Sequence, residues 1–375
     1  MKTPTNTAVV GLGIGMAHVA GYLDSPGANL VAVADAWAPR RERVGGTFSQ
    51  GSMLSLRPLF NEALLDSRWE DLGVRVYDDV QAIVDDSGID LVSLCTPDDT
   101  HEPYGIMLLE AGKHLLLEKP VALSVEAAGR LAAAARANDR RISVGYEMRV
   151  NPAVLKIREL IGAGLVGNVR AFSLYQYRGS FRRDKWQKWI QERDRSGGLL
   201  VEETCHWFDL ARFLTGREVT HVHCVGTDLV HADFDYEDIA FIQGSYADGS
   251  AFQIGHSLTG FDFSLVIQVY GDGGSIWCGL KAAPHSLLDG GQSTYMGIVS
   301  WGPVNAAPGD GSFVTFGDEV LEGESIRDNV AHTVNALREG TPFTAEFDDG
   351  LRSLQIALAA RYSLESGTPV EVDQT

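Results

Sequence analysis

The chain of 375 residues has little of several features that would assign it to a specialised class of protein. Its four cysteines are far apart and form no C-x-x-C motif, which argues against a structural zinc site or a disulfide scaffold and suits a reducing compartment. Apolar runs stay well short of the roughly 18 residues that a membrane span requires. No signal-peptide pattern precedes the first predicted strand, so we expect a cytoplasmic protein.

Positive charge is also scarce. The 31 Lys and Arg residues are outnumbered by 50 Asp and Glu residues, and the formal net charge is -19. A surface with this excess of negative charge repels phosphate groups, so we expect neither nucleic acid nor an anionic membrane as a partner. The hydrophobic content of 45% is ordinary for a soluble globular protein, and the length allows two domains.

The first motif that is present is a glycine-rich turn, which follows a short apolar run at residues 8–10. Glycines let backbone N–H groups approach a pyrophosphate, and the N-terminus of the following helix favours its negative charge. The motif departs from G-x-G-x-x-G, because a methionine takes the place of the third glycine. Alone it is a weak signal. The cofactor contacts that it predicts are Gly11, Gly13, Ile14, Gly15 and Met16.

A second apolar run, residues 30–34, ends at Asp35. An acid about 20 residues after such a glycine turn accepts hydrogen bonds from the ribose hydroxyls of adenosine. No arginine follows Asp35 immediately, which favours NAD over NADP. Arg40 and Arg41 are near enough in the sequence to keep NADP open.

Two further predicted strands also end in polar residues. Residues 91–95 lead into Thr96, Pro97 and His101, and residues 115–117 lead into Glu118, Lys119 and Pro120. Ligands bind beyond the carboxyl ends of parallel strands, where Lys119 could donate to a substrate oxygen. A Lys/Glu pair on a solvated turn is the alternative. Strands and helices alternate as far as residue 146, which predicts a doubly wound parallel sheet.

From about residue 149 the pattern changes. Residues 169–177, 219–225, 239–246, 251–258 and 263–270 alternate in polarity, with hairpin turns between some of them. We therefore predict an α/β protein with an N-terminal Rossmann domain, residues 1–148, and a C-terminal α+β domain, residues 149–375. The sheet of the second domain is expected to be open and mostly antiparallel. The segments 44–73 and 281–317 are not assigned.

A second group of chemically active residue types lies at 196–209. After a glycine turn, a predicted helix carries Glu202 and His206 four residues apart, and hence on one face, followed by Asp209. An imidazole between carboxylates is suited to act as a general base near neutral pH. A solvated Glu/His ladder and a metal site are alternatives. Apolar flanking residues disfavour the ladder, and because no third ligand can be placed we predict no metal.

The segment 175–195 combines aromatic and cationic side chains, among them Tyr175, Arg178 and Trp186. Aromatic rings stack on sugars, and cationic groups donate to hydroxyls, so this mixture suits a carbohydrate ligand. A contact with another domain or subunit explains the same composition equally well.

Taken together, these motifs resemble the Gfo/Idh/MocA family, the group of glucose–fructose oxidoreductase, inositol dehydrogenase and rhizopine catabolism. The Thr96-Pro97 and Glu118-Lys119-Pro120 motifs are similar to its central signature, and residues 197–209 are similar to its second. The resemblance implies a Rossmann domain followed by an open-sheet domain. It also implies a homodimer or homotetramer built through that sheet.

The resemblance further implies NAD(P)-dependent oxidation of a hydroxyl of a sugar, cyclitol or related polyol. Lys119 and His206 match the family's catalytic lysine and histidine, and Glu202 stands where many members carry aspartate. The segment from Tyr146 to Arg149 resembles the one that closes over the substrate, with a methionine in place of a frequent arginine. The predicted substrate contacts are Lys119, Tyr146, Arg149, Tyr175, Arg178, Trp186, Glu202 and His206.

Two other functions stay open at this point. Some members of the family use NAD for a transient oxidation followed by elimination, with net cleavage of a glycoside. A non-catalytic sugar-sensing regulator on the same fold is the second alternative, and the presence of both Lys119 and His206 argues against it. NADH that accumulates in step with product would exclude the elimination reaction.

Overall fold

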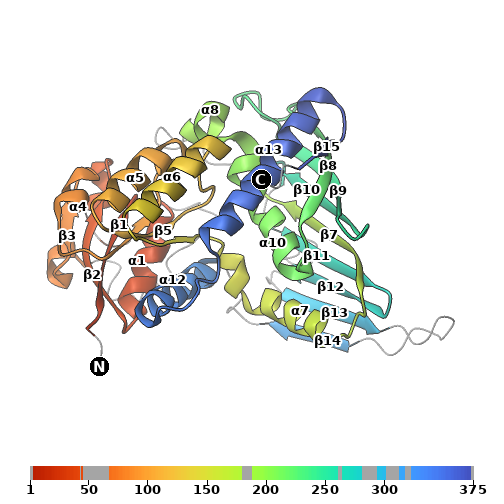
Figure 1. Ribbon diagram of the computed structural model, residues 1–375, viewed down its shortest axis with the longest axis horizontal. Helices are drawn as coiled ribbons and strands as arrows, with labels where there is room; N and C mark the ends of the chain where they lie inside the picture. Colours follow the sequence, from red (N-terminus) through yellow and green to blue (C-terminus); the bar gives the residue numbers. More distant parts are fainter. Residues whose placement is uncertain are drawn as a thin grey trace. The chain divides into compact units, whose positions relative to one another are not determined.

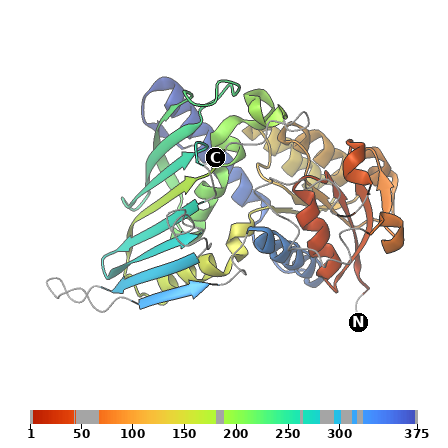
Figure 2. The ribbon, with the colours of Figure 1, turned by 180° about the vertical axis from the view of Figure 1, so that it is seen from behind.

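The computed structural model describes residues 3–42, 44, 67–179, 188–260, 264–280, 294–300, 312–316 and 322–372. The chain forms two compact units (Figures 1 and 2). The first comprises Met1–Val150 and Glu322–Leu354, and the second comprises Asn151–Leu321 and Gln355–Thr375. This division differs from the predicted limits of 1–148 and 149–375, because a segment near the C-terminus packs with the first unit. The unassigned segments 44–73 and 281–317 lie largely outside the described residues.

The first unit contains a parallel sheet of six strands in the order β3-β2-β1-β4-β5-β6. Strands β4 and β5 are almost wholly buried, as expected for parallel strands that are covered on both faces. The strand order reverses between β1 and β4, which is where such sheets bind ligands. The strands are β1 (Thr5–Val10), β2 (Ala28–Ala34), β3 (Arg75–Tyr77), β4 (Leu91–Leu94), β5 (His114–Leu117) and β6 (Ile142–Val144).

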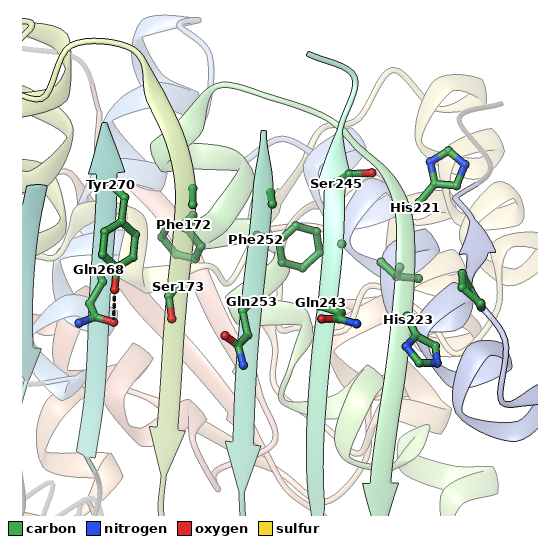
Figure 3. Close-up of a pocket in the computed structure, with 15 residues that line it drawn as sticks. Phe172, Ser173, His221, His223, Gln243, Ser245, Phe252, Gln253, Gln268 and Tyr270 are labelled. Atoms are coloured by element: carbon green, nitrogen blue, oxygen red, sulfur yellow. Dashed lines mark hydrogen bonds between the residues drawn. The ribbon is translucent and has the colours of Figure 1, made fainter. Parts of the chain in front are cut away.

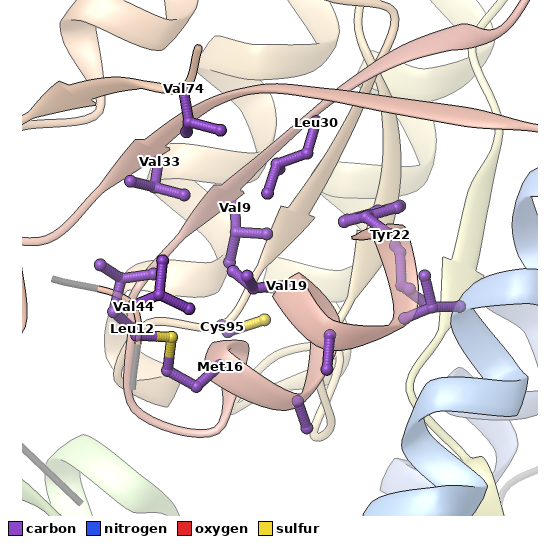
Figure 4. Close-up of a cluster of buried hydrophobic side chains, with 14 of the residues drawn as sticks. Val9, Leu12, Met16, Val19, Tyr22, Leu30, Val33, Val44, Val74 and Cys95 are labelled. Carbon is purple, nitrogen blue, oxygen red and sulfur yellow. The ribbon is translucent and has the colours of Figure 1, made fainter. Parts of the chain in front are cut away.

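The helices of the first unit pack in pairs, α1 with α12 and α5 with α6. Helix α12 contributes Ile326, Val330 and Val334, at helical spacing, to the core cluster around β1 and α1 that Figure 4 shows in part. The helices are α1 (Gly15–Asp24), α2 (Ala38–Arg41), η2 (Trp69–Leu72), α4 (Gln81–Asp85), η3 (Asp98–Thr100), α5 (His101–Glu110), α6 (Val125–Ala137), η4 (Glu147–Val150), α12 (Glu322–Glu339) and the first part of α13 (Phe347–Ser366).

The second unit contains a sheet in the order β14-β13-β12-β11-β7-β10-β9-β8-β15. Strands β7 and β10 pair in parallel, and the other pairs are antiparallel. The predicted fold class is therefore confirmed. The strands are β7 (Val169–Tyr177), β8 (Val219–Thr227), β9 (Ile239–Tyr246), β10 (Ala251–Ser257), β11 (Ser264–Gly271), β12 (Gly274–Leu280), β13 (Thr294–Ser300), β14 (Ser312–Phe316) and β15 (Val370–Glu371).

One face of this sheet is covered by helices, and α10 packs against both β7 and α7. The other face, which we call the outer face, carries a row of polar side chains across neighbouring strands, namely Ser173, Gln253, Gln243 and His223 (Figure 3). The remaining helices of this unit are α7 (Pro152–Gly162), η5 (Lys188–Gln191), α8 (Arg193–Ser196), α9 (Gly198–Glu202), α10 (Cys205–Thr215) and the second part of α13.

Candidate active site

The glycine turn joins β1 to α1 at the carboxyl edge of the first sheet. Gly11 has a φ of +90°, and a Cβ there would lie 2.3 Å from the carbonyl oxygen of Cys95, so this position requires glycine. A Cβ on Gly15 would lie 2.8 Å from Cγ1 of Val9. Gly15 thus permits the close packing of helix on strand that the third glycine usually permits. Met16 can therefore turn its side chain into the core, where it is 1% exposed.

The N-terminus of α1 has the features of an anion site. In the part of the chain that the structure describes, no side chain caps this end, its N-cap is Ile14, and its first turn holds no acid. The first backbone N–H groups of a helix need an acceptor, and a phosphate can supply one. Gly13, in the same turn, has the Arg40 guanidinium as its nearest neighbour, since a Cβ there would lie 3.5 Å from Nη1. The turn therefore fits the pyrophosphate of a dinucleotide.

Asp35 is held in place at the end of β2. The backbone N–H of Leu12 donates to its Oδ2 at 2.6 Å, and the N–H of Trp37 donates to its Oδ1 at 2.7 Å. Each carboxylate oxygen keeps a second lone pair for a ribose hydroxyl. Arg40 reaches the same place, with Nη1 3.6 Å from Oδ2 and its guanidinium 5.1 Å from the centre of the Trp37 ring. An acid and an arginine therefore border the expected ribose position together.

The ends of β4 and β5 are tied together by His101, the first residue of α5. Its Nδ1 lies 2.7 Å from the carbonyl oxygen of Pro120, and its Nε2 lies 3.0 Å from that of Thr96. The side chain is fully buried, and burial lowers the pKa of the imidazole. The Thr100 hydroxyl donates to the Pro97 carbonyl at 2.6 Å. These contacts indicate that His101 positions the two loops, whereas Thr96 and Pro97 lie beside the switch point itself.

Glu118 and Lys119 follow β5 and point to different places. The Glu118 carboxylate turns inward, with Oε1 2.9 Å from Nε2 of His18 and Oε2 accepting from the Lys119 backbone N–H at 3.3 Å. A Cβ on Gly145 would lie 2.6 Å from Oε1, so the end of β6 must be glycine to admit the carboxylate. Lys119 remains partly exposed at the carboxyl edge. Of the two, the lysine is the group that a ligand can reach.

Tyr146 and Arg149 are both buried, with Tyr146 only 1% exposed. The Arg149 guanidinium contacts both oxygens of Asp349, with Nη1 to Oδ2 at 3.0 Å and Nη2 to Oδ1 at 2.9 Å. It also donates to the Thr344 carbonyl at 2.9 Å. This two-point ion pair lies within the first unit and fixes η4 against α13. Arg149 therefore has a structural role, and its contact with a substrate stays a prediction.

The second group of predicted residues lies where one helix was expected. Helix α9 ends at Glu202, α10 begins at Cys205, and the prediction of an uninterrupted helix over residues 196–209 is wrong. Two successive glycines with φ of +79° and +73° form the N-cap and the first residue of α9. Thr204 stabilises the break between the helices. Its N–H and its hydroxyl both donate to the Leu199 carbonyl, at 3.0 and 2.9 Å. Glu202 and His206 therefore belong to two short helices.

Glu202, His206 and Asp209 are all buried within the second unit. The ring of His206 lies 5.6 Å from that of Trp207. Burial, together with the negative charge of Glu202, raises the pKa of Tyr236, whose hydroxyl donates to the Ile190 carbonyl at 2.5 Å. Glu202 and His206 are thus each in surroundings with little water, where electrostatic interactions are strong.

Arg178 is paired with Glu203 at the break between the two helices. The amide of Gln176 continues this contact, since its Nε2 donates to Glu203 at 3.4 Å and its Oε1 accepts from the Trp207 indole at 2.7 Å. The end of β7 therefore anchors the helix break beside Glu202 and His206. Arg178 consequently has a positioning contact, in addition to any contact with a substrate.

Tyr175 lies on the other side of the sheet from Gln176, because successive side chains of a strand alternate between faces. It is 39% exposed on the outer face and stacks on Phe241 at 6.4 Å between ring centres. The structure therefore separates Tyr175 from the helices that carry Glu202 and His206. Trp186 lies outside the described residues.

Three polar residues at these sites were not identified from the sequence. His18 lies within the apolar stripe of α1, and a histidine in such a stripe was the only available signal. Glu203 was adjacent to a predicted site residue, and nothing local distinguished it. Asp349 lies in a helix far along the chain, so its contact with Arg149 had no signal in the sequence.

Neither a metal site nor a membrane helix emerges from the described ranges. Within them, no three His, Cys, Asp or Glu side chains are grouped to hold a metal ion. Their helices include none with the length and apolarity of a membrane span. The four cysteines are buried free thiols.

Comparisons with known proteins cover both units. A family model described as an oxidoreductase family with an NAD-binding Rossmann fold matches residues 5–146. A second model, described as the GFO/IDH/MocA C-terminal domain, matches residues 154–277. The two matches together take in most of the chain, including the glycine turn and the Glu202–His206 region.

Similar proteins extend over the full length. The scyllo-inositol 2-dehydrogenase (NAD(+)) of Bacillus subtilis (strain 168) is 27% identical over 381 residues, which is 100% of this chain and 98% of that protein. The inositol 2-dehydrogenase of Rhizobium meliloti (strain 1021) is 24% identical and covers 96% of each chain. The solved structure of a levoglucosan dehydrogenase in complex with NADH has a TM-score of 0.78 at 21% identity and covers 100% of both chains. At 21% identity, the likeness to this solved structure shows the fold of the chain alone.

Proposed function

The chain belongs to the Gfo/Idh/MocA family of NAD-binding oxidoreductases, and from this premise we propose that it oxidises a secondary hydroxyl of a sugar, cyclitol or related polyol. The observation that carries the proposal is the position of Lys119 beyond β5, at the carboxyl edge of a Rossmann sheet and one strand from its switch point. Relatives named as inositol dehydrogenases make a cyclitol the first substrate to test.

In this proposal Lys119 donates to the oxygen of the reacting hydroxyl, and His206 accepts its proton as general base. A buried imidazole is suited to that task near neutral pH, and Glu202 orients it. Bound NAD would supply the acceptor for the hydride. The protein's part is to hold the carbinol carbon at reactive distance and to exclude water.

We propose NAD as the preferred cofactor. The fixed carboxylate of Asp35 keeps a free lone pair on each oxygen, which supports binding of both ribose hydroxyls. A 2′-phosphate would meet the negative charge of Asp35, and Arg40 would offset only part of the repulsion. NADP is therefore expected to bind more weakly rather than not at all.

We also propose that the protein forms a homodimer or homotetramer through the outer face. On that face, Tyr175, Phe241 and Val225 are 39%, 43% and 53% exposed and follow one another in register, with Gly255 between the first two. An exposed apolar row on a sheet is a typical contact surface. The four buried thiols suit the reducing cytoplasm in which we place it.

The test is a panel of scyllo-inositol, myo-inositol, aldoses, uronic acids and glycosides, followed by NADH absorbance with NAD and then with NADP. On a substrate that is turned over, Lys119→Met and His206→Ala should each lower kcat by about 10²- to 10⁴-fold, with NADH affinity changed less than about threefold. Lys156→Met, at a partly exposed side chain of α7, and His332→Ala, at an exposed side chain of α12, serve as controls. Full activity of both site variants would refute the assignment, and a released leaving group without net NADH would indicate oxidation followed by elimination.

A further inference from the structure

A chain of buried polar side chains runs through the first unit from α1 to the residue before Lys119. We propose that His18 is a positioning residue, which fixes the Glu118 carboxylate and through it the presentation of Lys119. The proposal rests on the proposed role of Lys119 in the reaction. None of the motifs that identify the cofactor or substrate residues assigns this role to His18.

This hydrogen-bonded network consists of four side chains, which come from α1, from β4 and from the residue that follows β5. His18 of α1 is fully buried, with Nε2 2.9 Å from Oε1 of Glu118 and Nδ1 2.9 Å from Oγ of Ser93 on β4. The Ser93 hydroxyl in turn lies 2.7 Å from the hydroxyl of Tyr22, one turn further along α1. Ser93 is fully buried and Tyr22 is 1% exposed.

The chemistry of these groups restricts the order of donors along the network. An ionised carboxylate can only accept, so Nε2 of His18 must carry a proton, and in the proposed arrangement Nδ1 is the acceptor. The Ser93 hydroxyl then donates to Nδ1, and its oxygen accepts from Tyr22. Burial raises the pKa of Tyr22, so this phenol keeps its proton and can donate. The histidine tautomer is therefore determined by its two neighbours.

The His18 ring is the side-chain donor that lies 2.9 Å from the Glu118 carboxylate. Cys95 and His101 also face it, and Lys119 follows it. Burial and the charge of Glu118 raise the pKa of the Cys95 thiol, and burial lowers the pKa of His101, which is engaged with two carbonyl oxygens. The Nε2–H of His18 thus donates directly to the carboxylate. A buried carboxylate that loses such a donor becomes easier to protonate.

The carboxylate also has little freedom to rearrange. A Cβ on Gly145 would lie 2.6 Å from Oε1, so the backbone at the end of β6 closes one side. On the other side Oε2 accepts from the Lys119 N–H at 3.3 Å. A protonated or rotated Glu118 would weaken this backbone contact and change both the direction of the Lys119 side chain and the charge beside its amine.

Two substitutions of His18 separate the two halves of its hydrogen bonding. His18→Gln can place an amide N–H near the position of Nε2, which keeps a donor for Glu118 and gives up the acceptor for Ser93. His18→Asn can place an oxygen near the position of Nδ1, which keeps the acceptor for Ser93 and gives up the donor for Glu118. Val330→Ala is the stability control, because Val330 packs against α1 at Gly21 and its apolar side chain takes no part in the hydrogen bonds of the network.

We expect His18→Asn to lower kcat by about tenfold or more, with NADH affinity changed less than about threefold, and to move the acid limb of the kcat profile upward by about one pH unit. His18→Gln should keep kcat within about threefold of the wild type and leave the limb in place. Val330→Ala should lower Tm without moving the limb. Equal losses in both His18 variants that follow Tm, with the limb unmoved, would overturn the proposal.

Two measurements need no substrate and so separate this proposal from the proposed function. In protein labelled with 15N-histidine, His18 should show a protonated Nε2 and an unprotonated Nδ1, with His18→Gln used for assignment. The pH at which the Lys119 amine becomes reactive towards reductive methylation, followed by mass spectrometry, should shift in His18→Asn and not in His18→Gln. A ring without a proton on Nε2, or equal Lys119 reactivity in the two variants, would refute the role of His18 even if every substrate failed.

Discussion

The two sheets of this protein handle polar residues in opposite ways. The parallel sheet of the first unit has helices on both faces, and the buried polar side chains of His18, Ser93 and Glu118 beside it are hydrogen-bonded to one another. The larger sheet of the second unit has one helix-covered face and an outer face lined with Gln, Ser and His side chains (Figure 3).

The two regions differ in whether the neighbouring atoms can move when a residue is substituted. At the carboxyl edge of the first sheet, the backbone at Gly11 approaches the Cys95 backbone so closely that there is no room for a side chain. On the outer face of the second sheet, exposed side chains can turn aside. We therefore expect the first sheet to be sensitive to small changes and the outer face to be tolerant, and each prediction below tests that contrast.

The largest difference should appear between two glycines. Gly11→Ala places a Cβ 2.3 Å from the Cys95 carbonyl oxygen at a φ of +90° and should lower the free energy of unfolding by about 2–4 kcal/mol. Gly255→Ala meets the exposed ring of Tyr175, which can move, and should cost less than about 1 kcal/mol. Urea denaturation measures both. Equal costs would contradict the contrast between the sheets.

The second-largest effect is expected in the cofactor preference, when residues at the carboxyl edge of the first sheet are substituted. Asp35→Ser removes the acceptor for the ribose hydroxyls and should lower kcat/KM for NAD by about 10- to 100-fold while improving NADP. Arg40→Ala should weaken NADP more than NAD, because its guanidinium lies 3.6 Å from the Asp35 carboxylate. Arg68→Ala is the control, because Arg68 forms an exposed ion pair with Glu70 in the same unit. Unchanged preference in Asp35→Ser would place the ribose elsewhere.

A pH effect of intermediate size is expected from His114 at the start of β5. Its Nδ1 accepts from the Arg141 N–H at 3.0 Å, and burial with the charges of Arg140 and Arg141 lowers its pKa from 6.5 to about 4. The unfolded chain therefore takes up the proton first as the pH falls. The contribution to stability is complete above pH 6.5 and is lost between pH 6.5 and 4.

We expect this loss to amount to about 1–2 kcal/mol after allowing for partial exposure. His114→Asn, whose oxygen can accept from Arg141, should flatten the decline when unfolding by urea is measured at pH 7.5, 6 and 5. The same change at His221, exposed on the outer face, should not. If His114→Asn and wild type lose stability in parallel, His114 is not the source.

The smallest change in monomer stability should come from the outer face. Phe241→Ser, at a side chain 43% exposed, should alter the free energy of unfolding of the monomer by less than about 1 kcal/mol. It should nevertheless lower the concentration-dependent mass in sedimentation, because the proposed contact uses this row. Leu229→Ser, 86% exposed and outside the row, is the matched control. An unchanged mass in Phe241→Ser would move the contact to another surface.

The sequence by itself determined the features that depend on neighbouring residues. Apolar runs alternating with helices predicted the first sheet, alternating polarity predicted the second, and a glycine turn after a strand predicts the cofactor end of the first one. The polar residues at strand ends, such as Lys119, could be placed at an edge because the carboxyl ends of parallel strands lie together. These inferences use local geometry, which the chain carries within a few residues.

Only the tertiary structure decided which distant groups meet. Helix α12 completes the core of a unit that begins some 300 residues earlier in the sequence, and Arg149 pairs with Asp349. The break between Glu202 and His206 depends on contacts with β7, and the role inferred for His18 depends on Glu118. Such contacts depend on how separate elements pack, and the pattern of residues within one element does not specify its partner.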